Sequence, residues 1–225
     1  MSKKYELIAS DVDGLYRVKA LKDFGNVKAG DVGGYVAGEH NLSHDGNCWV
    51  YDGARVFDNA WVTDDVRVFG NAHVYGNPRA SGVACIYENA RLYGDAYVHG
   101  NVRLRGDCSV YGDARVFGNA WIRGNASVFG SAHVFGNAHI ESNADVSETS
   151  DYFVVGPDPF LDRFTTVHKT VNGYSINHGN YSVNNIKDMD NDIKRECSYH
   201  EHTKSYYEIV SGSIALWVKQ NVNNT

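Results

Sequence analysis

The sequence repeats with a period of six residues, and this period allows very few folds. The segment RVFGNA occupies residues 67–72 and recurs at 115–120, which is 48 residues or eight blocks later. With the frame set at Cys48, 17 consecutive blocks run from CWVYDG to ADVSET at 144–149 and cover 102 residues without an insertion. The block LSHDGN at 42–47 is a degenerate eighteenth copy. A fixed short period indicates a solenoid, in which each repeat packs only against its neighbours.

Each block predicts a short strand followed by a corner. The third position is Val, Ile or Leu in 16 of the 17 blocks, with Ala80 as the exception, and the first position is Ala in 12 blocks. Side chains two residues apart lie on the same side of a strand, so positions one and three face a common core while positions two and four face outward. Positions five and six are mostly Gly followed by Asn or Asp, which tolerate the tight backbone of a corner.

Three such blocks close one coil of 18 residues, because no hairpin signal interrupts them. The arrangement resembles the left-handed parallel β-helix of hexapeptide-repeat proteins. VFGNA at 68–72 and at 116–120 matches the family pattern, in which a small residue follows an aliphatic residue after four positions. The left-handed sense is implied by the resemblance. We therefore expect an all-β solenoid of about six coils, about 29 Å tall at roughly 4.8 Å per coil.

The flanking segments lack the regular repeat, and they predict three parts in the chain. We expect N-terminal strands and a cap in residues 1–41, the hexapeptide-repeat β-helix in 42–149 and a small α+β domain in 150–225. The NG pair at 172–173 predicts a hairpin turn between two strands. Helical spacing predicts two helix faces. The first contains Ile186, Met189, Ile193 and Cys197, and the second contains Tyr206, Ile209, Val210 and Trp217.

Composition describes an ordinary soluble protein of 225 residues. Its formal charge of -6 does not fit a protein that is basic overall and binds nucleic acid. The four cysteines form no CxxC pair, and the opening MSKKYELIAS lacks the apolar core of a signal peptide. No apolar run approaches the roughly 18 residues of a membrane span. We therefore expect a reduced cytoplasmic protein without a membrane partner.

One outer face is predicted to carry an aromatic ladder. Residues 18 apart lie directly above one another in successive coils, and the fourth positions of one face are all aromatic. The ladder consists of Phe57, Tyr75, Tyr93, Tyr111 and Phe129. Such rings stack at parallel-strand spacing, and an exposed apolar strip this long is uncommon on a monomer. We expect it to stabilise the solenoid or to form the interface of a homo-oligomer, with a ligand platform as the alternative.

A second outer face interleaves arginines with aromatic rings. We name it the arginine–aromatic face. Its candidate ligand-binding residues are Arg67, Arg103, Arg105, Trp121 and Arg123. Three of these arginines lie within a few ångströms of one another, which is costly unless acids, solvent or an anionic ligand compensate. Guanidinium groups beside flat rings suit a nucleotide or another anionic small ligand, whereas a solvated basic stripe is the structural alternative.

Arginines occur at the second position of every other block between residues 55 and 115, so they are spaced by twelve residues. They are Arg55, Arg67, Arg79, Arg91, Arg103 and Arg115. A step of twelve moves to another face of an 18-residue coil, so one face receives an arginine only at every second coil, about 9.6 Å apart. This spacing keeps stacked like charges separate and is a structural explanation that needs no binding partner.

No residue is assigned a catalytic role, and no cofactor or metal is expected. Many β-helix proteins of the family are trimeric acyltransferases with a histidine base, which would make His73, His99, His133 or His139 the candidates. All four occupy outward repeat positions, and no loop leaves the coils between 48 and 149 to build an acceptor site. Asp11 and Asp13 in DVDG resemble a phosphatase motif, but a repeat follows them instead of a doubly wound domain. The HEH triplet at 200–202 matches no standard zinc spacing.

A closer resemblance covers almost the whole chain. YRVKALKDFGNVKAGDVGGYV at 16–36, NLSHDGNCWV at 41–50, the repeats and TTVHKTVNGYSINHGNYS at 165–182 are similar to hexapeptide-repeat proteins of phages and prophages. Members of that family are labelled acyltransferase-like from their fold. The resemblance implies an accessory protein that counteracts host defence in the host cytoplasm by binding a nucleotide, a nucleic acid or a host protein.

These observations give one leading hypothesis and two alternatives. The leading hypothesis is a non-catalytic, trimeric binding protein that holds an anionic ligand or a host protein through its outer faces. The first alternative is an acyltransferase that uses acyl-CoA between subunits. The second alternative is a structural solenoid that assembles end to end through its flanking caps.

Overall fold

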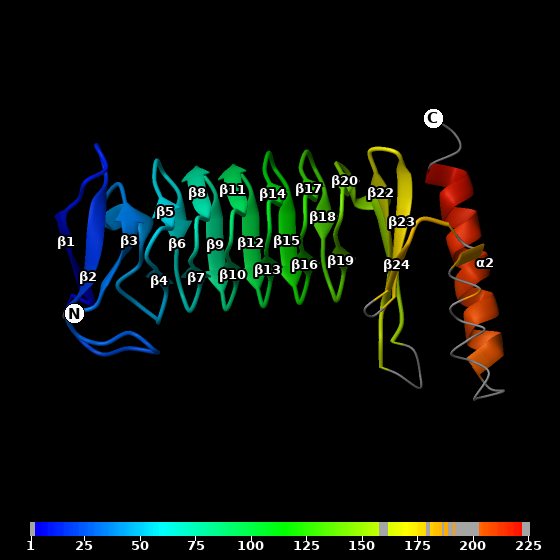
Figure 1. Ribbon diagram of the computed structural model, residues 1–225, viewed down its shortest axis with the longest axis horizontal. Helices are drawn as coiled ribbons and strands as arrows, with labels where there is room; N and C mark the ends of the chain where they lie inside the picture. Colours follow the sequence, from blue (N-terminus) through cyan, green and yellow to red (C-terminus); the bar gives the residue numbers. More distant parts are fainter. Residues whose placement is uncertain are drawn as a thin grey trace.

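The computed structural model describes residues 3–157, 162–178, 181–185, 187–188, 191 and 203–221. The chain forms a parallel β-solenoid of about six turns of about 18 residues, followed by a small antiparallel sheet and a helix. Figure 1 shows the coils stacked along the long axis, with β1 (Tyr5–Ala9) near one end and α2 (Thr203–Asn221) at the other. The all-β solenoid expected from the six-residue period is confirmed.

Three sheets form the sides of the solenoid. The first contains β1, β2 (Tyr16–Ala20), β3 (Val32–Val36), β5 (Arg55–Val56), β8 (His73–Gly76), β11 (Arg91–Gly94), β14 (Ser109–Val110), β17 (Ser127–Val128) and β20 (Asp145–Val146). The second contains β4 (Trp49–Val50), β7 (Arg67–Val68), β10 (Cys85–Ile86), β13 (Arg103–Leu104), β16 (Trp121–Ile122) and β19 (His139–Ile140). The third contains β6 (Trp61–Val62), β9 (Arg79–Gly82), β12 (Tyr97–Gly100), β15 (Arg115–Gly118) and β18 (His133–Val134).

The core is a column of small and branched apolar side chains along the axis. Third-position residues from Val50 to Val146 are fully buried, and the Ala residues at first positions are buried with them. Ala80, the exception in the third column, is also fully buried, and β9 keeps its register with β6 and β12 on either side. The alternation of inward positions predicted from the repeat is therefore correct.

Corners close because the fifth position adopts a left-handed backbone. Gly82 and Gly100, at equivalent corners, have φ angles of 77° and 92°. Four non-glycine residues at this position also adopt the left-handed backbone, at a steric cost: Asp58, Asp64, Glu88 and Ser142, with φ between 53° and 62°. Sixth-position amides add ladders along the corners, as when Asn59 donates to Asn77 (3.1 Å) and Asn77 donates to Asp95 (3.0 Å).

Proline at position 78 does not loosen the stack. Its carbonyl accepts a hydrogen bond from the backbone N–H of Trp61 at 2.9 Å. At the equivalent first position of several other blocks, the N–H makes a local corner bond, such as Ala60 to Phe57 at 3.3 Å, whereas only Cys48 of the described first positions donates to the next coil. A proline there therefore removes no bond between coils, although proline inside a sheet normally does.

The N-terminal end of the stack is closed by an antiparallel pair and a buried lysine. β1 pairs with β2, β2 pairs with β3, and β3 continues in parallel with β5. The ammonium of Lys4, which is 1% exposed, donates to the carbonyls of Gly46 (3.3 Å) and Cys48 (3.0 Å). The hydroxyl of Tyr5 donates to the carbonyl of Leu42 at 2.7 Å. These bonds satisfy carbonyls of the first coil that have no preceding coil as a partner.

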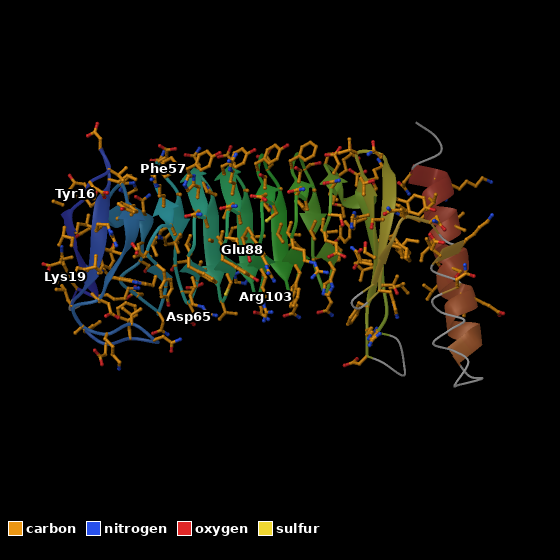
Figure 2. All side chains as sticks on the ribbon, in the orientation of Figure 1. Tyr16, Lys19, Phe57, Asp65, Glu88 and Arg103 are labelled. Carbon is orange, nitrogen blue, oxygen red and sulfur yellow. The ribbon has the colours of Figure 1, made fainter. Side chains whose placement is uncertain are left out.

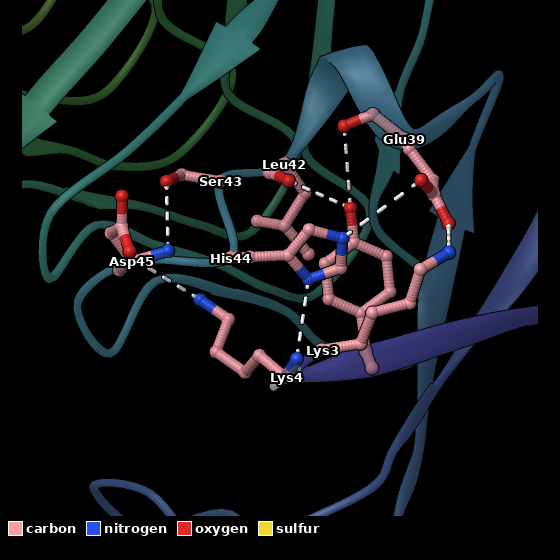
Figure 3. Close-up of polar contacts among 8 residues, drawn as sticks. Lys3, Lys4, Glu39, Leu42, Ser43, His44 and Asp45 are labelled. Carbon is pink, nitrogen blue, oxygen red and sulfur yellow. Dashed lines mark hydrogen bonds and ion pairs between the residues drawn. The ribbon is translucent and has the colours of Figure 1, made fainter. Parts of the chain in front are cut away.

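A short 3-10 helix, η1 (Glu39–Asn41), and a histidine complete this cap (Figure 3). Lys3 forms an ion pair with Glu39 at 2.6 Å, and the ring of His44 accepts the backbone N–H of Lys4 at 3.3 Å. Because Nδ1 of His44 is an acceptor, this bond requires the neutral ring. Burial lowers the pKa of His44 and favours the same form.

The C-terminal end is closed by side chains of the antiparallel sheet. This sheet contains β21 (Tyr152–Val155), β22 (Thr165–Thr170), β23 (Gly173–His178) and β24 (Tyr181–Val183). Thr166 Oγ1 accepts the N–H of His139 at 3.0 Å, and His168 Nε2 accepts the N–H of Glu141 at 3.4 Å. The amide of Asn177 donates to the carbonyl of His139 at 3.0 Å. The free edge of β19 is thus paired with side chains instead of a further strand.

The third-sheet edge is closed in the same way by the turn that follows the last coil. η2 (Thr149–Asp151) places the Thr149 hydroxyl 3.1 Å from the N–H of His133. The hydroxyl of Tyr152 accepts the N–H of Phe135 at 3.1 Å. Both ends of the stack therefore carry caps, which does not favour assembly end to end.

The last part of the chain packs a helix against the antiparallel sheet. Thr170 pairs with Gly173 across the hairpin, so the predicted hairpin is correct, but its two-residue turn is Val171–Asn172 and Gly173 already begins β23. Helix α2 buries Val210, Ile214, Trp217 and Val218 with Val167 and Ile176 of the sheet. Ile209 was predicted on the buried face but is 68% exposed, because Ile214 and Val218 supply the turns that contact the sheet. The predicted helix face from Ile186 to Cys197 lies outside the described residues.

We predict that the cost of a corner substitution depends on the coil above it. A Cβ on Gly82 would lie 2.6 Å from the nitrogen of Gly100, whereas a Cβ on Gly136 in the same column meets no atom within 4 Å. Both have a left-handed backbone, so each alanine costs about 1 kcal/mol from strain alone. Gly82→Ala should lower the free energy of unfolding in urea by at least about 2 kcal/mol more than Gly136→Ala. Equal losses would show that crowding between coils is unimportant.

We also predict that acid weakens the C-terminal cap through His168. This ring is fully buried, and burial lowers its pKa below the ordinary value of 6.5. Its Nε2 accepts from Asn177 at 3.0 Å and from the N–H of Glu141, so the fold requires the neutral ring. The stabilising contribution is complete above pH 6.5 and decreases as the pH falls toward the folded-state pKa, by at most about 1.4 kcal/mol per pH unit.

The measurement is urea unfolding between pH 8 and 5 for the wild type, His168→Gln and the exposed control His133→Gln. The His168→Gln profile should be flatter, because glutamine can accept the same bonds without titrating. His44, His73 and His139 act in the same direction, since burial lowers their pKa values as well, so part of the slope remains. Identical dependence of the unfolding free energy on pH in all three proteins would contradict the assignment of this acid sensitivity to His168.

Candidate functional site

The aromatic ladder on the first sheet is formed as a regular stack. Successive ring centroids from Phe57 to Phe129 lie 5.1, 5.0, 4.8 and 5.1 Å apart, with planes within 6° of parallel. All five rings are half-buried. Figure 2 shows Phe57 on one long side of the solenoid, where a row of rings follows the coils. Stacking places the ring faces against one another, so the edges of the rings form the outer surface.

On the arginine–aromatic face, Trp121 is enclosed between its two neighbours. The guanidinium of Arg103 lies 4.6 Å from the indole centroid, and the ring of His139 stacks on it at 5.2 Å. Because β13 and β19 flank β16 on opposite sides, both faces of the indole are covered. A ligand could reach only the edge of Trp121.

Two of the crowded arginines are neutralised by glutamates. Arg105 forms an ion pair with Glu88 at 2.8 Å, and Arg123 pairs with Glu141 on the next coil. Both glutamates come from other blocks of the repeat, so the compensation expected for this cluster is supplied by acids of the chain itself. The ion pairs leave Arg67 and Arg103 without a carboxylate partner among the described residues.

A groove lies at the N-terminal end of this face, and Arg67 is part of its wall. The groove has a volume of about 560 Å³ and separates the segment before β3 from the second sheet. Trp49, only 2% exposed, forms its floor. Its lining is Asn26, Val27, Asp31, Val32, Gly33, Trp49, Tyr51, Asp52, Arg67, Phe69 and Gly70. Sequence reasoning singled out Arg67 but missed the groove, which forms only where the irregular N-terminal segment folds over the coils.

The polar groups of the groove differ in the hydrogen bonds that they can form with a ligand. Arg67 donates to the thiol of Cys85 at 3.3 Å, which leaves its other N–H groups free for an acceptor. Burial raises the pKa of the Tyr51 hydroxyl, so this group remains a neutral donor. Asp52 is paired with Arg17 at 2.6 Å, and Asp31 accepts the N–H of Lys28 at 2.8 Å. The groove therefore combines one cation, aromatic side chains and two acids with partners of their own.

The third sheet carries exposed rings and arginines that the sequence analysis did not assign to a site. The signal was present in the sequence as the 18-residue series Trp61, Arg79, Tyr97, Arg115 and His133. These residues form one register on adjacent strands from β6 to β18. Counting by 18 from Trp61 places all five residues on the third face of the solenoid.

The four repeat histidines do not form a recognisable catalytic arrangement. His99 Nδ1 lies 2.9 Å from the hydroxyl of Ser81, His73 packs edge-on against Phe57 at 6.2 Å, and His139 stacks on Trp121. Within residues 48–149, the coils continue without an inserted loop. The described residues contain no group of three metal-binding side chains, and Cys197, His200 and His202 lie outside them. Asp11 accepts a hydrogen bond from Tyr35 at 3.0 Å in the turn after β1.

Comparisons with known proteins support the solenoid fold and do not indicate a function. No helix of the described residues is long and apolar enough to cross a bilayer. None of the curated proteins matches the chain. A family model described as the YdcK beta solenoid repeat matches residues 110–124, a segment that contains β15 and β16. This segment of the chain is therefore similar to a β-solenoid repeat family.

Proposed function

We propose that this chain is a non-catalytic binding protein whose groove beside Arg67 holds an anionic ligand with a planar ring, such as a nucleotide. One observation carries the proposal: an arginine without a carboxylate partner in the described chain borders a concave site lined by aromatic side chains. Ligand sites are typically concave and apolar, with a few polar groups that fix orientation. The volume of about 560 Å³ lies in the range of small-molecule sites.

Each part of such a ligand has a partner in the groove. Arg67 can bind a phosphate group with two N–H donors, as guanidinium groups commonly do. The rings of Tyr51 and Phe69 meet nearly at right angles, with centroids 6.1 Å apart, so a planar ring can pack against them. The carboxylate of Asp31 keeps acceptor capacity for a ring N–H. A phosphate alone would use only Arg67, which favours a ligand that also has a ring.

We also propose that the protein assembles into a homotrimer. The aromatic ladder is the proposed interface, because five aromatic rings in one row are an unusually long strip for a free surface.

The proposed location and biological role rest on other features of the chain. The free thiols of Cys48, Cys85 and Cys108 support a reducing compartment such as the cytoplasm. An accessory role of the phage type against host defence follows from the resemblance of the opening and repeat sequences.

The groove is tested by isothermal titration calorimetry with AMP, GMP and inorganic phosphate. Arg67→Gln should weaken binding of the preferred nucleotide at least tenfold, because a charge-assisted hydrogen bond contributes about 1.5–3 kcal/mol. Arg91→Gln, at the same repeat position on the first sheet, is the matched control and should leave the affinity unchanged. Absence of binding by all three probes, or equal losses in both variants, would refute the groove as the site.

The trimer is tested by sedimentation velocity over a range of protein concentrations. Tyr93→Lys should convert a trimer into a monomer, because it would place three lysines in the proposed interface. Tyr87→Lys is the control, since Tyr87 stacks on Phe69 at 4.9 Å in a similar environment on the second sheet. A wild-type monomer, or dissociation by Tyr87→Lys instead, would exclude the ladder as the interface.

A further inference from the structure

The outer surface of the third sheet carries the most exposed aromatic residues of the repeat. Trp61, Tyr97, Phe117 and Phe135 are 43, 37, 37 and 46% exposed, whereas the rings of the ladder are half-buried. We call the outward side chains of β6, β9, β12, β15 and β18, together with Phe135 just beyond β18, the third face. Solitary exposed rings are ordinary on protein surfaces, but four along one narrow sheet are not.

The charge of the third face is entirely of one sign. Its second positions are Trp61, Arg79, Tyr97, Arg115 and His133, and its fourth positions are Thr63, Ser81, His99, Phe117 and Phe135. None of these outward positions is acidic. The acids near this face lie at its corners. After β6, Asp64 accepts the N–H of Gly82 at 2.8 Å and Asp65 accepts the amide of Asn47 at 2.7 Å. At the corners that precede the strands, Asp58 accepts the N–H of Gly76 at 3.1 Å, Asp95 accepts the amide of Asn77 at 3.0 Å, and Asp113 precedes Arg115 by two residues. No ion pair involves Arg79 or Arg115 among the described residues.

Cations and rings alternate in register along the third face. Trp61 pairs with Arg79 on the next strand, Arg79 with Tyr97, and Tyr97 with Arg115. The guanidinium of Arg79 lies 5.8 Å from the ring centroid of Trp61. Adjacent strands are roughly 4.8 Å apart, so the five strands span about 19 Å. The result is a straight, narrow row in which a cation recurs about every 9.6 Å between exposed rings.

We propose that the third face binds single-stranded nucleic acid along the axis of the solenoid. Single strands are held by positive side chains that follow the phosphates and by aromatic side chains that stack on the bases. Arg79 and Arg115 would contact phosphates, while Trp61, Tyr97 and Phe117 would pack against bases. A duplex keeps its bases stacked inside and would leave these rings without partners.

A second copy of the chain fits the third face less well. Two copies that met through this face would bring Arg79 and Arg115 of each against the same cations, and none of the outward positions of the face is acidic. The inference is independent of the groove, because no residue of the third face lines it. It adds a site for a polymer to the proposed site for a small ligand.

Fluorescence anisotropy with labelled dT12, U12 and a 12-base-pair DNA duplex, measured between 50 and 200 mM salt, tests this inference. The wild type should bind a single strand more tightly than the duplex. The double variant Arg79→Gln/Arg115→Gln should weaken binding at least tenfold and reduce the slope of log K against log salt by about two. Trp61→Ala/Phe117→Ala should weaken binding at least tenfold with the slope unchanged, because stacking carries no charge.

Matched control variants distinguish binding at the third face from binding at the first sheet or in the groove. Arg55→Gln/Arg91→Gln removes two arginines from the equivalent positions of the first sheet, and Arg67→Gln removes the cation of the groove; neither should alter oligonucleotide binding. Thermal unfolding by circular dichroism verifies that each variant folds. Absence of binding at 50 mM salt, equal losses in the controls, or duplex binding that the ring substitutions leave unchanged would overturn the inference.

Discussion

The whole structure depends on the backbone hydrogen bonds that join each coil to the next. The N–H of Tyr51 donates to the carbonyl of Val68 at 2.8 Å, and the same relation recurs at Phe69 with Ile86 and at Tyr87 with Leu104. Because these bonds hold every block in register, a residue has a fixed neighbour 18 positions away on each side. Core columns, corner amide ladders and outer faces all follow from this register.

The same bonding requires partners at the two ends, where a coil has only one neighbour. The chain solves this with side chains, and the two solutions differ chemically. At the first coil, a buried ammonium and a phenol donate to free carbonyls, and at the last coil threonine hydroxyls, a neutral imidazole and an amide serve the free groups of the edge. The irregular segments are therefore the parts that make a finite solenoid stable.

Equal geometry on the three sides gives surfaces with different chemistry. The first side stacks five rings and shows their edges, and the second neutralises Arg105 and Arg123 with glutamates. The third side carries Arg79 and Arg115 beside exposed rings, and neither arginine forms an ion pair within the described part of the chain. A substitution at an exposed outward position changes surface contacts with little effect on the core, because the first and third positions supply most of the packing. Such a scaffold can change its ligands while the fold stays constant.

The sequence by itself determined the fold of the repeat and the composition of each column. A strict period leaves one way to bury Val50 to Val146 and one set of neighbours for Phe57, so the core and the aromatic ladder could be predicted by counting. The ends and the site could not be predicted in this way. Lys4 approaches Cys48, Glu88 pairs with Arg105, and the segment before β3 forms a groove beside Arg67 only in the folded chain. Those contacts depend on where irregular segments and long side chains settle, and no period specifies that.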